Sequence, residues 1–231
     1  PGFNFRKLWK NLNALDTALE ENLDYAFSEE LGYLTACPTN LGTGIRASVM
    51  MHLPSLVLAG HMEKIVRAIS QMGMAVRGLY GEGSEATGSI FQISNQQTLG
   101  LSEEDIIKNL TRALLAIIEH EQNAREKLLE SDASALYDKI ARAYGLLQSS
   151  FKITSTEAMN LLGLLRVAVD LKALPEEARP EIDRLFITCQ PGHISLISRT
   201  ASTPEKRDTF RAQYLKKQFE KFPNLDFKKT S

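Results

Sequence analysis

The stretch CPTNLGTGIRASVMMHL, residues 37–53, joins a turn to a strand and decides how the first half of the chain folds. From residue 45 to residue 53 every odd position is apolar, while the even positions carry Arg46, Ser48, Met50 and His52. This alternation is the period of a strand with one buried face. Pro54 ends the strand. The pattern predicts a sheet whose edge begins at the turn that follows Cys37.

Around this stretch, the first half of the chain mixes helices with strands. Apolar residues recur at helical spacing from Phe5 to Leu19, and Ser102 followed by Asp105 is a capping box that opens a long helix. The remaining predicted elements are a short strand at Tyr33–Ala36, one or two helices over Leu56–Met72, and strands around Met74–Tyr80 and Ser89–Ser94. The glycine-rich loop GEGSEATG, residues 81–88, lies between the last two strands.

From about residue 125 onward the pattern is helical throughout. The predicted helices are Ser134–Gln148, Ser155–Leu174, Arg179–Cys189 and Pro204–Phe222. The pairs Pro175/Pro180 and Pro191/Gly192 punctuate these segments. The sequence therefore predicts an α+β domain with a mixed sheet over residues 1–124, followed by an all-helical domain over residues 125–231.

Composition excludes several classes of protein. With 27 Lys and Arg against 28 Asp and Glu, the net charge of -1 gives no general attraction to nucleic acid or to anionic membranes. Two cysteines, Cys37 and Cys189, are too few for a disulfide framework, which favours the reducing cytoplasm. No signal peptide and no membrane-spanning apolar run is found. Because the chain begins at Pro1 and runs directly into a helix, we expect a fragment of a longer protein.

Three side chains in the first half are candidates for a functional site. Cys37 faces a turn whose hydroxyl and amides can lower a thiol pKa, although a free cysteine also serves as a small buried apolar residue. Arg46 and Arg77 lie at the ends of predicted strands, where two guanidinium groups can clamp a phosphate. Solvated or salt-bridged arginines are the alternative.

The glycine-rich loop is not a dinucleotide site, because a strand rather than a helix follows it. No P-loop motif is present either. Glu82 and Glu85 can supply a general base from this loop, or can belong to a solvated hairpin tip. The four histidines are scattered without a metal-binding spacing, so we expect no protein-bound metal, and magnesium would arrive with a nucleotide.

The last predicted helix carries RDTFRA, residues 207–212. Arg207 and Arg211 share one helical face, where two like charges repel unless an anion lies between them. With Asp208 on the adjoining face, the group suits a ligand that has both a phosphate and a guanidinium, although a solvated basic helix gives the same pattern. The segment from Glu205 to Lys229 contains eight basic and four acidic residues. This surplus of positive charge allows at most weak contact with nucleic acid.

Several motifs, taken together, resemble the C-terminal part of the guanidino (phosphagen) kinases. They are CPTNLGTGIRASV (37–49), RGLYGEGSEATGSIFQISN (77–95) and LGLSEEDI (99–106). RDTFRA and the helical tail are similar to one branch of this family, the bacterial protein-arginine kinases, so the resemblance covers essentially the whole chain. It implies an antiparallel sheet flanked by helices, and transfer of the γ-phosphoryl group of ATP, with Mg²⁺, to arginine side chains of proteins.

The resemblance also implies a role for individual residues. Cys37 would contact the substrate guanidinium, Thr39 would tune that thiol, and Glu82 would deprotonate the acceptor. Residues implied to bind ATP are Arg46, Ala47, Ser48, Val49, Met50, Arg77, Gly78, Leu79, Tyr80, Gly81 and Glu82. Residues implied to form an allosteric phosphoarginine pocket are Arg207, Asp208, Thr209, Phe210, Arg211 and Ala212. Asn95 belongs to the family's sheet segment without an assigned role. Implied partners are protein substrates, an activator protein, the Clp protease machinery and a second copy of the chain in a homodimer.

The chain departs from the family pattern at two places. The family's N-terminal acidic motif, a catalytic glutamate and further phosphate-binding arginines would precede Pro1, so we expect this piece to be inactive alone. Where creatine and arginine kinases carry an arginine after I-S-N, this chain has Gln96, Gln97 and Thr98. A kinase of small guanidine metabolites and a non-catalytic phosphoarginine-binding module remain the alternatives.

Overall fold

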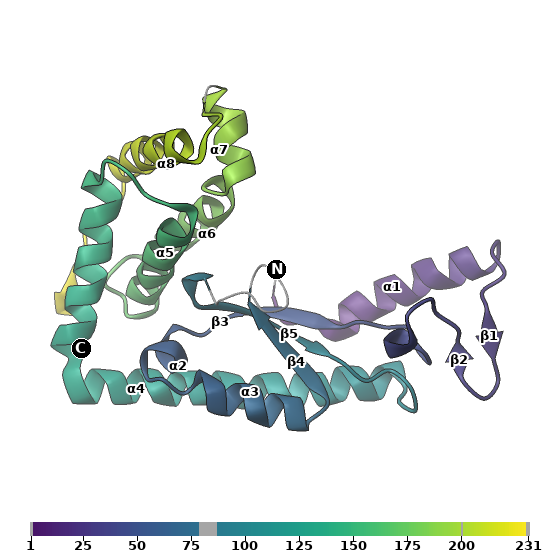
Figure 1. The fold of residues 1–231 in the computed structure, drawn as a ribbon. Coiled ribbons are helices and arrows are strands. Elements are labelled where there is room, and N and C mark those ends of the chain that lie inside the picture. The colour runs from purple at the N-terminus through teal and green to yellow at the C-terminus, as the bar shows by residue number, and fades with distance from the viewer. Residues whose placement is uncertain (1, 79–86, 200, 230–231) are drawn as a thin grey trace. The chain divides into compact units, whose positions relative to one another are not determined.

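The computed structural model describes residues 2–78, 87–199 and 201–229, and its elements are labelled in Figure 1. The helices are α1 (Phe5–Glu20), α2 (Pro54–Leu58), α3 (Met62–Gln71), α4 (Glu103–Ser149), α5 (Ser155–Asp170), α6 (Arg179–Thr188), α7 (Pro191–Ser198) and α8 (Pro204–Phe219). The strands are β1 (Phe27–Ser28), β2 (Gly32–Tyr33), β3 (Ser48–His52), β4 (Met74–Gly78) and β5 (Ile90–Asn95). None of the described helices combines the length and the apolar character that crossing a membrane requires.

The chain forms two compact units. The first unit contains residues 1–49, 63–76 and 92–118, and the second contains residues 50–62, 77–91 and 119–231. Helix α4 passes residue 124 without interruption, and non-helical backbone occurs within it at Asp132, with φ of -160°. The division at residues 124/125 stays a prediction, while the compact units cut the chain at other positions.

A three-stranded sheet has the order β3-β5-β4, with β5 in the centre (Figure 1). Asn95 N donates to Ala47 O at 3.2 Å, and Leu53 N donates to Ser89 O at 2.8 Å, so β3 and β5 run antiparallel. The expected antiparallel α+β architecture is confirmed. The strand predicted from residue 45 begins at Ser48 instead, because a side-chain amide replaces the backbone ladder next to residues 45–47.

Two other predicted elements differ in the structure. The strand predicted at Tyr33–Ala36 is observed as Gly32–Tyr33, and the Thr35 hydroxyl donates to Cys37 O at 2.7 Å in the turn that follows. Pro191 and Gly192 follow the end of α6, as predicted, but they also open a further helix, α7, which the sequence pattern did not predict. Proline is well tolerated in the first turn of a helix, where no intrahelical N–H bond is lost.

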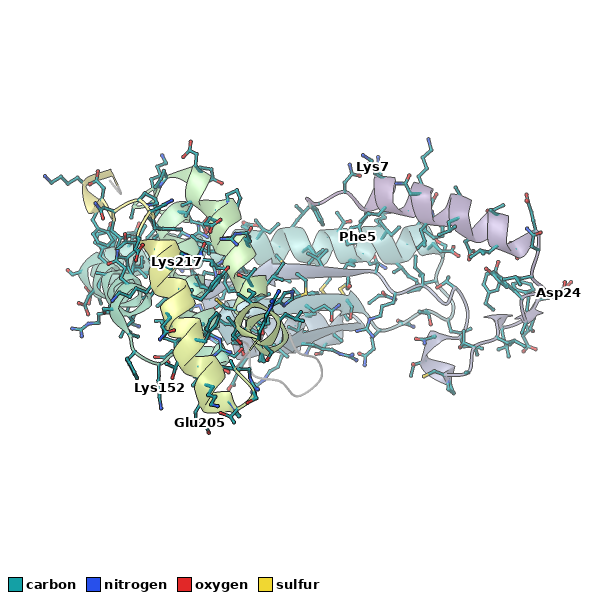
Figure 2. The ribbon with its side chains drawn as sticks, turned by 90° about the horizontal axis from the view of Figure 1, so that it is seen from above. Phe5, Lys7, Asp24, Lys152, Glu205 and Lys217 are labelled. Carbon is teal, nitrogen blue, oxygen red and sulfur yellow. The ribbon has the colours of Figure 1, made fainter. Side chains whose placement is uncertain are left out.

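Helix α1 forms as the apolar spacing predicts. Asn4 caps it through a side-chain oxygen that accepts from Lys7 N at 3.0 Å. Phe5 and Lys7 lie in its first turn, and Asp24 follows its end (Figure 2). No residue of α1 is buried, and its apolar stripe of Leu8, Leu12, Leu15 and Leu19 is 44–61% exposed.

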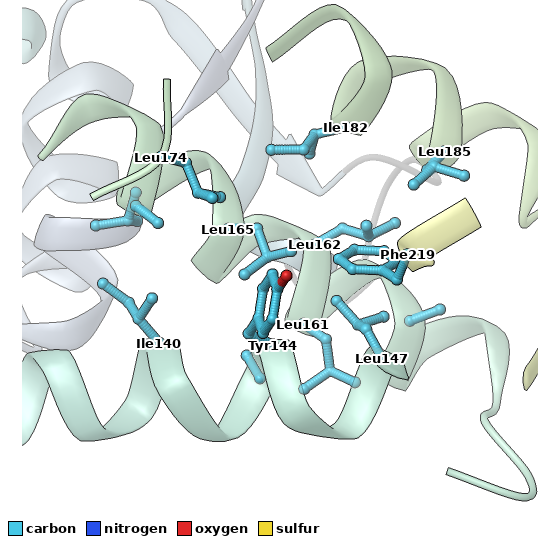
Figure 3. Packing of buried hydrophobic residues seen from close by; sticks show 14 of the residues in the cluster. Ile140, Tyr144, Leu147, Leu161, Leu162, Leu165, Leu174, Ile182, Leu185 and Phe219 are labelled. Carbon is cyan, nitrogen blue, oxygen red and sulfur yellow. The ribbon is translucent and has the colours of Figure 1, made fainter. Parts of the chain in front are cut away.

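The second unit holds the larger core, packed between α4, α5, α6 and α8 (Figure 3). Leu162 and Leu165 are completely buried, and Leu161 is 8% exposed, so the leucine-rich face of α5 belongs to this core. The Tyr144 hydroxyl donates to Pro223 O at 3.1 Å, so the polar end of this tyrosine side chain has a hydrogen-bond partner within the core. Other labelled members of the core are Ile140, Leu147, Leu174, Ile182, Leu185 and Phe219.

His52, at the end of β3, is half-buried in this unit, and its Nε2 atom has no contact with solvent. Its Nε2 atom has no hydrogen-bond partner among the described residues. Burial, and then the positive charges of Arg166, Arg125 and Arg179, lower the pKa of His52 to about 3. The imidazole is therefore neutral in the folded protein at pH values well above 3.

This depressed pKa makes stability depend on pH. Between pH 6.5 and 3 the unfolded chain binds a proton at His52 that the folded chain does not, so stability falls as the pH decreases. From pH 7.5 to pH 5.5 we expect the free energy of unfolding to lose about 1.4 kcal/mol from this group. Denaturant titrations at both pH values measure the loss. His52→Phe should remove it, and the exposed His61→Phe should retain it; equal losses in both variants would contradict this account.

Candidate active-site turn

Cys37 begins a tight turn in the first unit. It precedes the 3₁₀ turn Pro38–Asn40, and its carbonyl accepts from Asn40 N at 3.0 Å. Its exposed thiol lies with Sγ 3.0 Å from Thr39 Oγ1. Hydrogen bonds from the Thr39 hydroxyl and backbone N–H lower the pKa of Cys37, because both donors stabilise the thiolate. The other cysteine is different, since burial raises the pKa of Cys189 to about 12.

Alkylation with iodoacetamide tests this thiol directly. Thr39→Val removes the hydroxyl donor, so the pKa of Cys37 should rise and its alkylation rate at pH 7 should fall several-fold. The rate is measured for each cysteine by mass spectrometry of peptides, with Cys189 as the unreactive internal reference. Thr39→Ser keeps the donor and should react as the wild type does. A Thr39→Val rate that equals the wild-type rate would show that the hydroxyl does not stabilise the thiolate.

The end of β5 fixes the turn through side chains. Asn95 accepts from Ala47 N at 2.7 Å and donates to Ile45 O at 3.0 Å, so its amide acts as an added rung of the sheet. The Thr98 hydroxyl is 3.0 Å from Thr39 O and 2.8 Å from Leu41 O. Residues 95–98 therefore hold both sides of the turn that presents the thiol. The sequence singled out Asn95 and Thr98 without indicating this role.

Glycine is required at the bottom of the same turn. Gly42 has φ of +103°, and a Cβ there would lie 2.7 Å from Thr98 O. The close approach of the two backbones leaves no space for a side chain. The LGTG part of the motif thus has a packing reason in addition to its turn chemistry.

Arg46 stands on the polar side of the segment that leads into β3. It is exposed, and its Nη2 donates a long hydrogen bond of 3.4 Å to Ser94 Oγ, which is buried. Along residues 45–50 the odd positions are half-buried and the even ones exposed, so the predicted alternation is confirmed. Ala47, Ser48, Val49 and Met50 follow Arg46 in this alternating order. The guanidinium is thus held loosely on an accessible face.

The second predicted phosphate-binding segment is described in part. Arg77 is half-buried and Gly78 is buried, and both belong to β4. Leu79, Tyr80, Gly81 and Glu82 lie outside the described residues, as does Glu85. Among the described residues no three metal-ligating side chains gather into a metal site.

The two arginines of the RDTFRA motif on α8 have different surroundings, since Arg211 is buried and Arg207 is half-buried. Arg211 is 1% exposed and donates from Nε to Cys189 O at 2.8 Å, and from Nη1 to Ile153 O at 2.8 Å and to Asp208 Oδ1 at 2.6 Å. Arg207 is half-buried and donates to Ser202 O at 3.2 Å. Arg207 and Arg211 were predicted to share a ligand, but their surroundings differ. Asp208 and two backbone carbonyls already accept hydrogen bonds from Arg211.

A groove of about 390 Å³ follows a neighbouring face of α8. Two residues of the motif, Thr209 and Phe210, line it, together with Ala201, Glu205, Lys206 and Gln213. Glu205 and Lys217 lie near opposite ends of α8, with Lys152 near the Glu205 end (Figure 2). Arg207, Asp208, Arg211 and Ala212 do not line this groove.

Comparisons with known proteins give the family. The protein-arginine kinase of Clostridium tetani is 45% identical over 216 residues, which cover 94% of this chain and 64% of that protein. The protein-arginine kinase of Bacillus subtilis is 45% identical over 94% of this chain and 60% of its own length. The chain thus spans about three fifths of the length of these curated relatives. A taurocyamine kinase structure from Schistosoma mansoni has a TM-score of 0.48 and 32% identity over 53% of this chain and 17% of its own.

Family models divide the chain into two matched parts. Residues 133–230 match the model for the C-terminal domain of the protein-arginine kinase McsB. Residues 1–124 match the model described as the C-terminal catalytic domain of ATP:guanido phosphotransferases. This second match covers more than half of the chain and contains the Cys37 turn, Arg46 and β3 to β5. The chain therefore belongs to the ATP:guanido phosphotransferase family.

Proposed function

We propose that this chain is the C-terminal part of a protein-arginine kinase, which transfers the γ-phosphoryl group of ATP to arginine side chains of proteins. The observation that carries the proposal is the Cys37 thiol, exposed and 3.0 Å from the Thr39 hydroxyl, in the part that matches the catalytic domain. A thiolate in this position attracts a guanidinium. The match to curated protein-arginine kinases supports a protein acceptor over a free metabolite.

In this proposal the phosphates of Mg-ATP are held by arginines and by backbone N–H groups. Arg46 with residues 47–50, and Arg77 with residues 78–81, are the proposed ATP-binding segments. Glu82 is the proposed base that removes a proton from the guanidinium, which is a poor nucleophile until it is deprotonated. Phosphoryl transfer depends mostly on positioning and on cations that offset the developing charge, and this set of residues provides both.

The remainder of the proposed enzyme would come from sequence outside this chain. About two fifths of the length of the curated relatives has no counterpart in this chain, which supports further binding groups in that part. We therefore expect this chain alone to be inactive and the full-length protein to be the kinase. Cytoplasmic location, homodimer formation, an activator protein and delivery of products to Clp-type proteolysis belong to the same proposal.

Phosphoarginine recognition by α8 is the second part of the proposal. Arg207 supports it, because a guanidinium has five N–H donors and Arg207 places one on Ser202 O. Lys206, beside Thr209 and Phe210 in the 390 Å³ groove, adds a cation on the exposed surface. Arg211, surrounded by three acceptors, would support this site from within the core.

A phosphoryl-transfer assay on the full-length protein tests the function. Labelled Mg-ATP is incubated with an unfolded protein acceptor, and in parallel with free arginine, and the acid stability of the product is measured. Acid-labile label on the protein, lost in Glu82→Gln, supports the protein-arginine kinase because a phosphoramidate hydrolyses in acid. Label on free arginine alone would favour the metabolite kinase, and no transfer in either tube would favour the binding module.

A further inference from the structure

Thr98 carries a buried hydroxyl in the segment between β5 and α4. The residue is 5% exposed, and its Oγ1 atom lies 3.0 Å from Thr39 O and 2.8 Å from Leu41 O. A threonine hydroxyl has one proton to donate, so the two carbonyls share it. All three residues belong to the first compact unit. Thr98 thus joins two carbonyls of the turn that follows Cys37.

Thr39 is also the residue that contacts the thiol. Its Oγ1 atom lies 3.0 Å from Cys37 Sγ, and its backbone N–H is a second donor to the same sulfur. The carbonyl that accepts from Thr98 belongs to the same residue as these two donors. A change in the position of Thr39 O therefore changes the position of both donors. A single residue, Thr39, connects the buried Thr98 hydroxyl to the exposed thiol.

Other contacts hold the backbone of the turn beyond Thr39. Tyr33 N donates to Gly42 O at 2.8 Å, and Gly42 N donates to Tyr33 O at 3.3 Å. A Cβ on Gly42 would lie 2.7 Å from Thr98 O, so the two backbones approach closely there. These contacts do not involve the Thr98 hydroxyl and would keep the turn in place without it. The hydroxyl therefore acts on the exact position of Thr39 rather than on the presence of the turn.

We infer that Thr98 is a positioning residue for the acceptor guanidinium: by fixing Thr39 O, its hydroxyl holds the donors of Thr39 against Cys37 Sγ. This inference rests on the proposed function, in which the Cys37 thiolate attracts the guanidinium. Without these donors the negative charge on the sulfur is less stable. Displacements of about 1 Å can also lower a rate by as much as about 10²-fold, because the reacting groups lose their alignment. A buried side chain after β5 thus sets both the charge and the position of an exposed site residue.

Alkylation of this chain with iodoacetamide tests the connection without requiring kinase activity. Thr98→Val keeps the size of the side chain but removes the hydroxyl, so the pKa of Cys37 should rise and its alkylation at pH 7 should become at least about fivefold slower. At about pH 10 the thiol is ionised in both proteins and the rates should agree. Thr98→Ser keeps the donor and should restore the wild-type pH profile. The matched control is Thr43→Val, which removes a hydroxyl that accepts from Ile45 N at 3.3 Å and should leave the profile unchanged.

Kinetics of the full-length protein give the second measurement. Thr98→Val should lower kcat/KM for the protein acceptor about tenfold and leave KM for ATP unchanged, because Thr98 lies outside the proposed ATP-binding segments. Thr98→Ser should restore kcat/KM. Far-UV circular dichroism of each variant checks folding, and Thr98→Ala, which also lacks the hydroxyl, should show the same slower alkylation as Thr98→Val.

Other outcomes would overturn the inference. A wild-type pH profile in Thr98→Val and Thr98→Ala would show that the hydroxyl does not hold the donors to the thiol. Equal changes in Thr98→Val and Thr43→Val, or no recovery in Thr98→Ser, would make Thr98 a structural residue of the segment. Absence of phosphoarginine in the wild-type full-length protein is a separate result, because it overturns the proposed function and leaves the alkylation rates as they are.

Discussion

Arg46→Ala in the full-length protein is expected to lower kcat/KM for phosphoryl transfer by about 10²–10³-fold, the range observed when one preorganised donor to a developing charge is removed. Folding should be unaffected, because Arg46 is exposed and makes a hydrogen bond of 3.4 Å to Ser94. The measurement is steady-state kinetics of phosphoarginine formation, together with Tm by calorimetry.

Two further variants separate charge from geometry. Arg46→Lys keeps the positive charge but loses the planar fork that binds phosphate oxygens in pairs, so an intermediate loss is expected. Arg67→Ala is the matched control, because Arg67 is also an exposed arginine of the first unit, paired with Glu63 at 3.5 Å. It removes the same charge at a residue outside both proposed ATP-binding segments and should leave kcat/KM unchanged. Equal losses for Arg46→Ala and Arg67→Ala would indicate a general charge effect instead of a phosphate contact.

The sheet around Arg46 shows what the alternation of apolar and polar residues can predict and what it cannot. Alternating residues from Arg46 onward predicted which side chains face outward, and the exposures agree. Periodicity did not indicate that the ladder stops before Ser48, because that depends on Asn95, a residue 47 positions later whose amide bonds to Ile45 and Ala47. Contacts between distant segments of the chain leave no local pattern in either segment.

The helical part shows the same limit. Helical spacing predicted α5, α6 and α8 to within a few residues, but it did not predict α7, which begins at Pro191 directly after the end of α6. The spacing of Arg207 and Arg211 correctly placed them one turn apart on α8. It did not reveal that Arg211 faces a core in which Cys189 O and Ile153 O lie at hydrogen-bond distance, since these acceptors come from other helices' ends.

The surroundings of Arg211 give the second large expected effect, which concerns stability. Arg211→Met keeps most of the side-chain volume but leaves the Asp208 carboxylate and two buried carbonyls without their donor. Removing one partner of a buried ion pair typically costs about 3–5 kcal/mol, so we expect the free energy of unfolding to fall by about that amount. Denaturant unfolding of this chain, followed by far-UV circular dichroism, measures the change.

Arg207→Met is the matched control on the same helix. Arg207 is half-buried and donates to one carbonyl, Ser202 O, so its replacement should cost about 1 kcal/mol or less. The contrast decides between two roles for the RDTFRA motif. If Arg211 were primarily a ligand of phosphoarginine, both variants would lose phosphoarginine binding and both would keep wild-type stability. A selective loss of stability in Arg211→Met would instead assign Arg211 to the core and leave Arg207 as the cation available to the ligand. The reason is that the Arg211 guanidinium is already bonded to Asp208 and two carbonyls, and it cannot turn outward without leaving these three acceptors without a hydrogen-bond donor.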